Sequence, residues 1–225
     1  MHILKNLFIV VFLSFLFSIK GEAQTTEQSD FSGLKKCTVF SAGDDNVNSY
    51  RIPSLLTTKD GTLLVFCEAR RDSWRDKSRT DIVVKRSDDT GKTWSVMQDL
   101  TQGITGAYMD PTPILDSITG RIFLFTTFWP SEDHSGTKNR AILITSDDNG
   151  KTWSSPVDVT STIIPAGYHI VGFGPGAGLQ MSGKQFKERL VLPTRVVDSE
   201  RKSAHNVAIY SDNHGRTWTM GGKGD

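Results

Sequence analysis

Two short charged segments of this 225-residue sequence carry side chains that could bind and protonate an acidic ligand. Arg51 lies in the run Tyr50-Arg-Ile-Pro53, and both Arg70 and Asp76 lie in the run Glu68-Ala-Arg-Arg-Asp-Ser-Trp-Arg-Asp76. A guanidinium suits a carboxylate because it stays charged and donates two parallel hydrogen bonds. A loop aspartate acts as a proton donor, and then as a base, only where its surroundings raise its pKa or the ligand shields it. These residue types are compatible with acid recognition and proton transfer, and by themselves equally with ordinary surface ion pairs.

The composition excludes several other kinds of function. Lys and Arg number 26 against 25 Asp and Glu, and the net charge of +1 provides no general attraction for nucleic acid or an anionic membrane. With 23% charged and 37% hydrophobic residues, the chain has the profile of a soluble globular protein with a real core. The sequence contains no metal-ligand cluster and no nucleotide-binding loop, so we expect no cofactor.

An eight-residue repeat organises the scaffold that must position these side chains. The pattern S-x-[DN]-x-G-x-T-W occurs about 60 residues apart at Ser87–Trp94, Ser146–Trp153 and Ser211–Trp218. Each copy follows a β-prone run, at 81–86, 141–145 and 206–210, and is therefore expected to form a turn that leaves a strand. The short carboxylate or amide bonds nearby backbone N–H groups, the glycine accepts a positive φ, and the Trp buries against the sheet. Asn213 replaces the aspartate in the third copy, which preserves the hydrogen bonding but not the charge.

Two further sets of similar segments precede the copies of the eight-residue repeat. One joins residues 61–66 and 120–125, and the other joins residues 53–56, 113–115 and 178–181. Each repeating unit therefore holds about four short strands. Tandem units of four antiparallel strands are the blades of a β-propeller, so the expected fold is an all-β propeller. A β-sandwich has similar strand spacing but does not predict the same turn on every fourth strand.

The repeated turn resembles the Asp box, or BNR repeat, which is abundant in sialidases and also present in other propellers. The run Tyr50-Arg-Ile-Pro53 resembles the F/Y-R-I-P motif that sialidases place on their first strand, just ahead of the first box. The chain is thus similar to the sialidase (neuraminidase) family from about Cys37 to Trp218. This resemblance implies that Arg51 belongs to a cluster of three arginines that grips the carboxylate of sialic acid.

The same resemblance implies roles for three more residues. The family's E-x-R segment matches Arg70 as a second site arginine, and the loop acid that follows it matches Asp76 as the catalytic acid/base. Asp110, in Met109-Asp-Pro-Thr-Pro113, matches a D-P-T segment whose aspartate contacts substrate hydroxyls. In the family mechanism, which retains configuration, the acid protonates the leaving oxygen while a tyrosinate attacks the anomeric carbon.

Each of these residues also has an ordinary interpretation. Arg51 could form an exposed ion pair on a strand. Asp76 could be one acid among several in a charged loop, with Asp72 or Asp81 as the true counterpart of the family's acid. Asp110 could cap a turn before a proline.

The sequence holds only part of such an enzyme. Sialidase propellers have six blades, whereas residues 37–225, at about 60 residues per blade, hold three and a fraction. No downstream segment matches the family's remaining two carboxylate-binding arginines, its tyrosine nucleophile or the glutamate that activates that tyrosine. We therefore expect a truncated gene model or fragment, whose open sheet edge invites pairing with another chain.

Three functions follow as hypotheses. The first is an exo-α-sialidase that releases terminal sialic acid from glycoproteins, glycolipids or oligosaccharides, for which this fragment alone is expected to be inactive. The second is a non-catalytic propeller that binds sialic acid without hydrolysing its linkage. The third is a structural Asp-box propeller that serves protein recognition.

The N-terminal segment indicates export from the cytoplasm. Residues 7–19 are largely apolar but too few to span a bilayer, which requires roughly 20, so residues 1–23 are expected to form a secretory signal peptide. An uncleaved anchor is the alternative. Residues 24–36 would then form a linker to the propeller domain at 37–225, which is expected to be secreted or periplasmic and to have no stable membrane span. Cys37 and Cys67 could pair there or remain free thiols.

Overall fold

The computed structural model describes residues 36–102, 106–131 and 135–223. All of the described residues except Lys36 belong to one compact part of the chain, Cys37–Asp225. The expected signal peptide and all but the last residue of the expected linker lie outside the described residues. Among the helices of the described segments, none has the length and apolar character needed to cross a bilayer.

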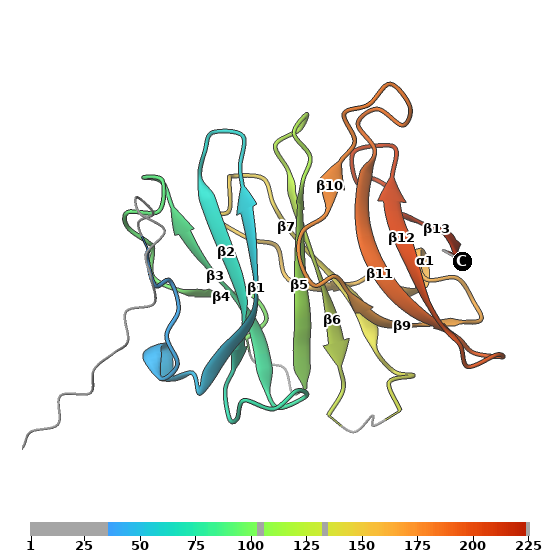
Figure 1. Cartoon of the computed structure of the whole chain (residues 1–225), viewed down its shortest axis with the longest axis horizontal. Coiled ribbons are helices and arrows are strands. Elements are labelled where there is room, and N and C mark those ends of the chain that lie inside the picture. The colour runs from blue at the N-terminus through green and yellow to red at the C-terminus, as the bar shows by residue number, and fades with distance from the viewer. Residues whose placement is uncertain (1–35, 103–105, 132–134, 224–225) are drawn as a thin grey trace, which may run out of the picture. The chain divides into compact units, whose positions relative to one another are not determined.

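Cys37–Asp225 is built from short strands with almost no helix (Figure 1). The first group, which we call unit 1, consists of η1 (Asp44–Asn46), β1 (Ser49–Thr57), β2 (Leu63–Arg70), β3 (Thr80–Ser87) and β4 (Gln98–Asp99). Unit 2 consists of β5 (Ala107–Leu115), β6 (Ile122–Trp129), β7 (Arg140–Ser146) and β8 (Val157–Asp158). Unit 3 consists of β9 (Tyr168–Phe173), β10 (Leu179–Gln180), β11 (Leu190–Asp198), β12 (Ala204–Ser211) and β13 (Thr219–Lys223), and α1 (Thr160–Ile163) precedes it.

Each unit is an antiparallel meander of neighbouring strands. Units 1 and 2 run in the orders β1-β2-β3-β4 and β5-β6-β7-β8, and one parallel residue pair, Thr80 with Ala107, joins them into a single eight-stranded sheet. In unit 3, β9 and β10 both pair with β11, so together they take the place of one first strand. The predicted four strands per unit are therefore confirmed, with the first strand of unit 3 divided into two pieces.

The hydrophobic core lies between successive units. One cluster joins β2 and β3 of unit 1 to β6 and β7 of unit 2, and a second joins unit 2 to unit 3. The largest fully buried side chains of this core include Phe66 in the first cluster and Phe123, Phe125 and Phe173 in the second. Because the strands are buried on both faces, their apolar residues form near-continuous runs, as in Ile122–Trp129. Each unit thus depends on its neighbour for the burial of its sheet.

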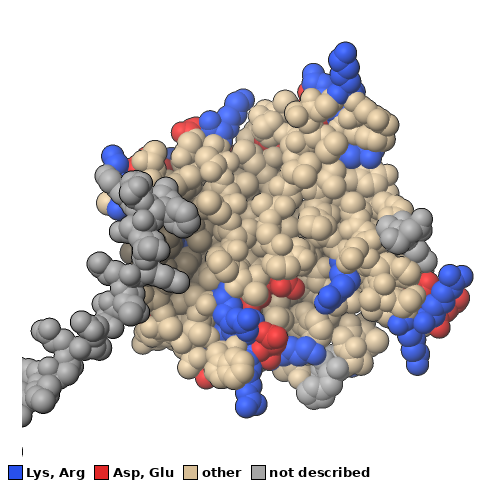
Figure 2. Space-filling model, viewed as in Figure 1, with Lys and Arg blue, Asp and Glu red and all other residues tan. Residues whose placement is uncertain are grey.

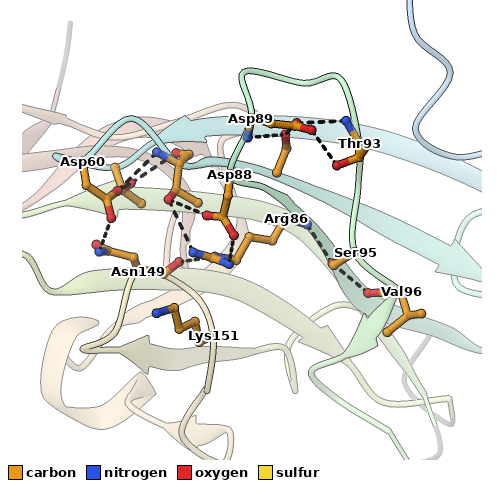
Figure 3. Close-up of polar contacts among 12 residues, drawn as sticks. Asp60, Arg86, Asp88, Asp89, Thr93, Ser95, Val96, Asn149 and Lys151 are labelled. Carbon is orange, nitrogen blue, oxygen red and sulfur yellow. Dashed lines mark hydrogen bonds and ion pairs between the residues drawn. The ribbon is translucent and has the colours of Figure 1, made fainter.

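The repeated turns have the hydrogen bonds that their residue types predict. In the first turn, Asp89 Oδ1 accepts hydrogen bonds from the backbone N–H of Lys92 at 3.0 Å and of Thr93 at 2.9 Å, and its Oδ2 accepts one from the Thr93 hydroxyl at 2.6 Å. The Ser87 hydroxyl accepts a hydrogen bond from the N–H of Gly91 at 2.9 Å. Figure 3 shows this arrangement around Asp89 and Thr93. These internal bonds lower the pKa of Asp89 to about 2, with the Thr93 hydroxyl as the largest cause.

Asn213 preserves this pattern but reverses the direction of one hydrogen bond. Its Oδ1 accepts the Thr217 N–H at 2.9 Å, as the aspartates do, but its Nδ2 donates to the Thr217 hydroxyl at 2.8 Å. The prediction that asparagine keeps the hydrogen bonding without the charge is confirmed.

The variable residue of each later turn binds the unit before it. Asn149, in the second turn, donates from Nδ2 to Asp60 of unit 1 at 2.7 Å, a contact shown in Figure 3. His214, at the same position of the third turn, lies with Nδ1 3.0 Å from the buried Asp116 of unit 2. The hairpin that follows the first strand of one unit is therefore tied to the Asp-box turn of the next.

The tryptophans of the later turns also pack on the preceding unit. Trp153 meets Phe66 of unit 1 edge to face, with ring centroids 5.5 Å apart. Trp218 contacts Phe123 and Phe125 of unit 2, at centroid distances of 5.4 and 4.9 Å. The sequence predicted that these rings bury against a sheet, and the sheet is that of the neighbouring unit.

Two glycines of the repeat allow this packing to be tested. Gly91 and Gly215 occupy the same turn position, with φ of +84° and +75°, so an added methyl strains both backbones equally. A Cβ at Gly215 would lie less than 3.0 Å from three atoms of the Phe123 ring, whereas the nearest atom to one at Gly91 is 3.6 Å away. We expect Gly91→Ala to cost about 1 kcal/mol and Gly215→Ala about 3 kcal/mol. Urea unfolding of both variants measures the difference, and equal losses would contradict packing between units.

Candidate active site

All four residues singled out from the sequence lie at one end of units 1 and 2. Arg51 is in β1, Arg70 is the last residue of β2, Asp76 is in the loop that follows, and Asp110 is in β5. Figure 2 shows acidic and basic side chains meeting at the lower edge of the visible face, near the lower ends of these strands. The strands thus deliver residues from both units to one place.

The first strands of units 1 and 2 are interrupted where they reach this site. The register of β1 shifts between Arg51 and Ser54, and that of β5 shifts between Met109 and Thr112. Ile52 and Asp110 themselves have φ values of 53° and 59°, a conformation that costs energy in a residue other than glycine. Such bulges turn side chains away from the plain alternation of a strand.

The buried thiol of Cys67 supports the first of these bulges. Its Sγ lies 3.0 Å from the backbone carbonyl oxygen of Arg51. Cys67 is a free cysteine, as is the exposed Cys37, and burial raises the pKa of the Cys67 thiol to about 12. This thiol is therefore a structural group and not a nucleophile.

Asp76 lies between the two arginines. Its Oδ1 is 2.7 Å from Nη2 of Arg70 and 3.4 Å from Nη1 of Arg51. The Arg70 side chain is only 1% exposed, whereas those of Asp76 and Arg51 are 67% and 46% exposed. A buried guanidinium therefore fixes one side of the carboxylate while its other side faces solvent, where a ligand has access.

The two other candidate acids of this region have different partners. Asp72 forms an exposed pair with Arg79 at 3.1 Å. Asp81 is buried and binds Arg71 Nε at 2.8 Å, and the other end of that guanidinium contacts Asp99. Of the three acids, Asp76 is the one that the structure places beside Arg51 and Arg70, and its catalytic role stays a prediction.

Glu68 connects the two halves of the site, although the sequence did not single it out. It is fully buried, and its Oε2 accepts hydrogen bonds from Nε and Nη2 of Arg70 at 3.0 and 2.7 Å. Its Oε1 accepts the backbone N–H of Asp110 at 3.0 Å. Burial raises the pKa of Glu68, an effect opposed by the Asp110 N–H and by Arg70. One carboxylate therefore orients the Arg70 guanidinium and anchors the bulge of β5.

Asp110 is a carboxyl group that resists ionisation. Burial is the largest cause that raises its pKa from 3.8 to about 6, and the negative charge of Glu68 adds to this shift. The positive charges of Arg195 and, to a smaller extent, of Arg70 oppose it. Because the folded-state pKa lies above the ordinary value, ionisation of Asp110 weakens the fold as the pH rises through about 6. A ligand that hydrogen-bonds to Asp110 would offset this cost.

Arg195 brings unit 3 into the site. With Asp110, it lines a cavity of about 240 Å³ whose wall also includes Gly172, Pro175, Pro193 and Asn206. Gly172 and Asn206 are the cross-strand partners of Arg195, and a Cβ on Gly172 would lie 2.9 Å from Asp110 Oδ2. The absence of a side chain at Gly172 therefore lets Asp110 approach unit 3. No motif in the sequence marks Arg195, because its placement depends on the pairing of β9, β11 and β12.

Taken together, the site can hold an acidic, hydroxylated ligand. Arg51 offers exposed guanidinium donors, Asp76 is an accessible carboxyl group, and Asp110 and Arg195 present an acceptor and a donor to one cavity. In the segments that the structure describes, no group of three or more His, Cys, Asp or Glu side chains is arranged to hold a metal ion.

Comparisons with known proteins identify the family. Residues 52–224 match the model of the BNR repeat-like domain. The chain is 32% identical over 209 residues to a sialidase of Paraclostridium sordellii, which covers 84% of this chain and 50% of that protein. It is also similar to the solved structure of the Hadza microbial sialidase Hz136, with a TM-score of 0.73 and 29% identity over 82% of this chain and 39% of that one.

A leech enzyme shares the fold at lower identity. This intramolecular trans-sialidase, solved with 2,7-anhydro-Neu5Ac after soaking with 3′-sialyllactose, has a TM-score of 0.73 and 21% identity over 86% of this chain and 46% of that one. The all-β architecture predicted from the repeat therefore matches that of sialidase propellers. This chain spans half or less of the length of the relatives named here. It belongs to the sialidase family, to which its BNR repeat-like domain connects it.

Proposed function

We propose that this chain carries the acid-binding part of an exo-α-sialidase, an enzyme that releases terminal sialic acid from glycoconjugates. The observation that carries this proposal is the position of Asp76, which is held at 2.7 Å by the buried Arg70 and at 3.4 Å by the exposed Arg51. Two cations beside one accessible carboxyl group match a ligand that has a carboxylate next to the bond to be cleaved. The membership of the chain in the sialidase family supports the same reaction.

Each site residue has a role in this proposal. Arg51 binds the sugar carboxylate, which draws this guanidinium away from Asp76. Arg70 is 1% exposed and already donates to Glu68, Trp74 and Asp76, so it holds Asp76 in place beside the ligand. Asp76, freed from one cation, becomes a better proton donor to the leaving oxygen because a nearby positive charge favours its ionised form. Asp110 hydrogen-bonds to hydroxyl groups of the sugar, and Arg195 completes the wall of the cavity that Asp110 lines.

The finer points of architecture and location are part of the proposal. The three units correspond to three blades of a six-bladed propeller in the whole protein. Its substrates are sialylated glycoproteins, glycolipids or oligosaccharides, encountered after export directed by residues 1–23. The leech relative, whose crystals were soaked with 3′-sialyllactose, supports an oligosaccharide substrate of this kind.

A non-catalytic sialic-acid-binding module is the second candidate. It is favoured by the state of the tyrosines on the strands that carry the site. Burial raises the pKa of both Tyr50 and Tyr108 to about 12, so neither hydroxyl ionises readily to a nucleophile. In such a module the arginines still bind the sugar acid, but the glycosidic bond is not cleaved.

Binding of sialic acid to this chain tests the common part of both candidates. We expect Arg51→Ala to lower the affinity about tenfold, because a charge-assisted pair to the carboxylate is lost. Arg121→Ala is a matched control, since Arg121 is 45% exposed and paired with Asp147 in another part of the chain. Isothermal titration or ligand-observed NMR measures both variants. Absence of binding by the wild-type chain, or equal effects of the two variants, would contradict the proposal.

A further inference from the structure

The loop that carries Asp76 also exposes a tryptophan. Trp74 is 66% exposed, although it is the largest apolar side chain of an otherwise polar loop. Its backbone oxygen accepts a hydrogen bond from Nη1 of Arg70 at 2.6 Å, while Nη2 of the same guanidinium binds Asp76 at 2.7 Å. A single buried group therefore fixes both Trp74 and Asp76, two residues apart.

The rest of the loop is braced as well. The Ser78 hydroxyl donates to the backbone oxygens of Ser73 and Arg75, at 3.1 and 2.9 Å. Lys77 packs over the ring of Trp129 in unit 2, with Nζ 4.0 Å from the ring centroid. The backbone beneath Trp74 is thus ordered before a ligand arrives, and the entropy cost of stacking on the indole is correspondingly small.

The position of Asp76 indicates what would cover this ring. A general acid must lie within hydrogen-bond distance of the oxygen that it protonates, so the leaving group of a sialoside begins beside Asp76. Arg51 and Arg70 lie against Asp76, and the proposed function places the sugar carboxylate at Arg51, which leaves the solvent side of Asp76 for the leaving group. A pyranose presents an apolar C–H face, and the flat apolar body of an exposed indole is complementary to it.

We propose that Trp74 is the platform on which the sugar next to sialic acid stacks, so that this site prefers sialic acid linked to another sugar. The inference rests on the proposed function and adds the part of the substrate beyond the sialic acid. Among the described residues, Phe186 is the one other large aromatic side chain that is exposed, and both it and the half-buried Trp129 already have a cation over the ring. Lys77 covers Trp129, and the Arg189 guanidinium lies 4.0 Å from the ring centroid of Phe186.

Saturation-transfer NMR of this chain with 3′-sialyllactose tests the proposal. In the wild-type chain we expect saturation on both the sialic acid protons and those of the adjoining galactose. In Trp74→Ala the galactose signals should fall relative to the sialic acid signals, and the affinity for 3′-sialyllactose should drop about fivefold. Trp74→Phe should restore most of both. Phe186→Ala, which removes an exposed aromatic ring of unit 3, should change neither.

Free sialic acid separates the possible outcomes. Its affinity should be the same for the wild-type chain and Trp74→Ala, because it has no adjoining sugar. If the wild-type chain binds neither ligand, the proposed function itself fails. If it binds both, and Trp74→Ala leaves the galactose signals unchanged or weakens the two ligands equally, the function stands and the role of Trp74 is overturned.

Discussion

Replacing Asp76 by asparagine should lower the turnover of a sialoside about 10²- to 10⁴-fold in a protein that carries the complete propeller. Asparagine keeps the size of the side chain but has no proton to give to the leaving oxygen. The measurement is kcat for a sialoside with a sugar leaving group and for one with an aryl leaving group. The aryl substrate should lose less activity, because a weakly basic leaving group needs less protonation.

Asp72→Asn provides the control for this variant. Asp72 belongs to the same loop, has a side chain 60% exposed and is paired with an arginine, as Asp76 is. Its replacement should leave kcat within about twofold, since surface ion pairs contribute little. Similar losses in both variants, or full activity in Asp76→Asn, would remove Asp76 from the mechanism.

Removal of the Glu68 carboxylate should destabilise the chain by about 3 kcal/mol. Glu68→Leu leaves the buried Arg70 guanidinium without its two hydrogen bonds from Nε and Nη2, and leaves the Asp110 N–H without an acceptor. Urea unfolding measures the free energy of unfolding. Binding of sialic acid should fall in the same variant, because Arg70 and Asp110 both lose their orientation.

A double-mutant cycle distinguishes an unpaired charge from simple loss of volume. The variant Glu68→Leu/Arg70→Met should be more stable than Glu68→Leu alone, because it no longer buries an uncompensated guanidinium. Additive effects of the two substitutions would show that the pair is not coupled. The ion pair between Glu68 and Arg70 would then have no part in holding the centre of the site together.

The sequence predicted the scaffold well because the scaffold is local and repeated. Each Asp box follows a strand within a few residues, and its hydrogen bonds form inside eight residues, so residue types alone indicate the turn. The divided first strand of unit 3 was not predicted. There β9 keeps a register shift of its own, between Arg195 and Val196 of its partner β11, and a loop that includes Gly174 and Gly176 at positive φ separates β9 from β10.

The site was predicted only where a motif marked it. Arg51, Arg70, Asp76 and Asp110 belong to recognisable segments, and the structure brings them together, while their catalytic and binding roles stay predictions. Glu68 and Arg195 were missed for a physical reason. The first acts through the N–H of a residue 42 positions away, and the second reaches the site through strand pairing in unit 3. Glu68 opens the E-x-R segment, but that motif was interpreted only for its arginine, and the strand pairing that places Arg195 leaves no signal in short sequence patterns.

The dependence of each unit on the turn of the next has a consequence for synthesis on the ribosome. Phe66 acquires its Trp153 contact, and Phe123 its Trp218 contact, from residues made long after the strands that need them. A nascent chain therefore carries an uncovered aromatic surface until about one more unit has emerged. Chaperone capture should be strongest in that interval and should end as each successive tryptophan leaves the exit tunnel.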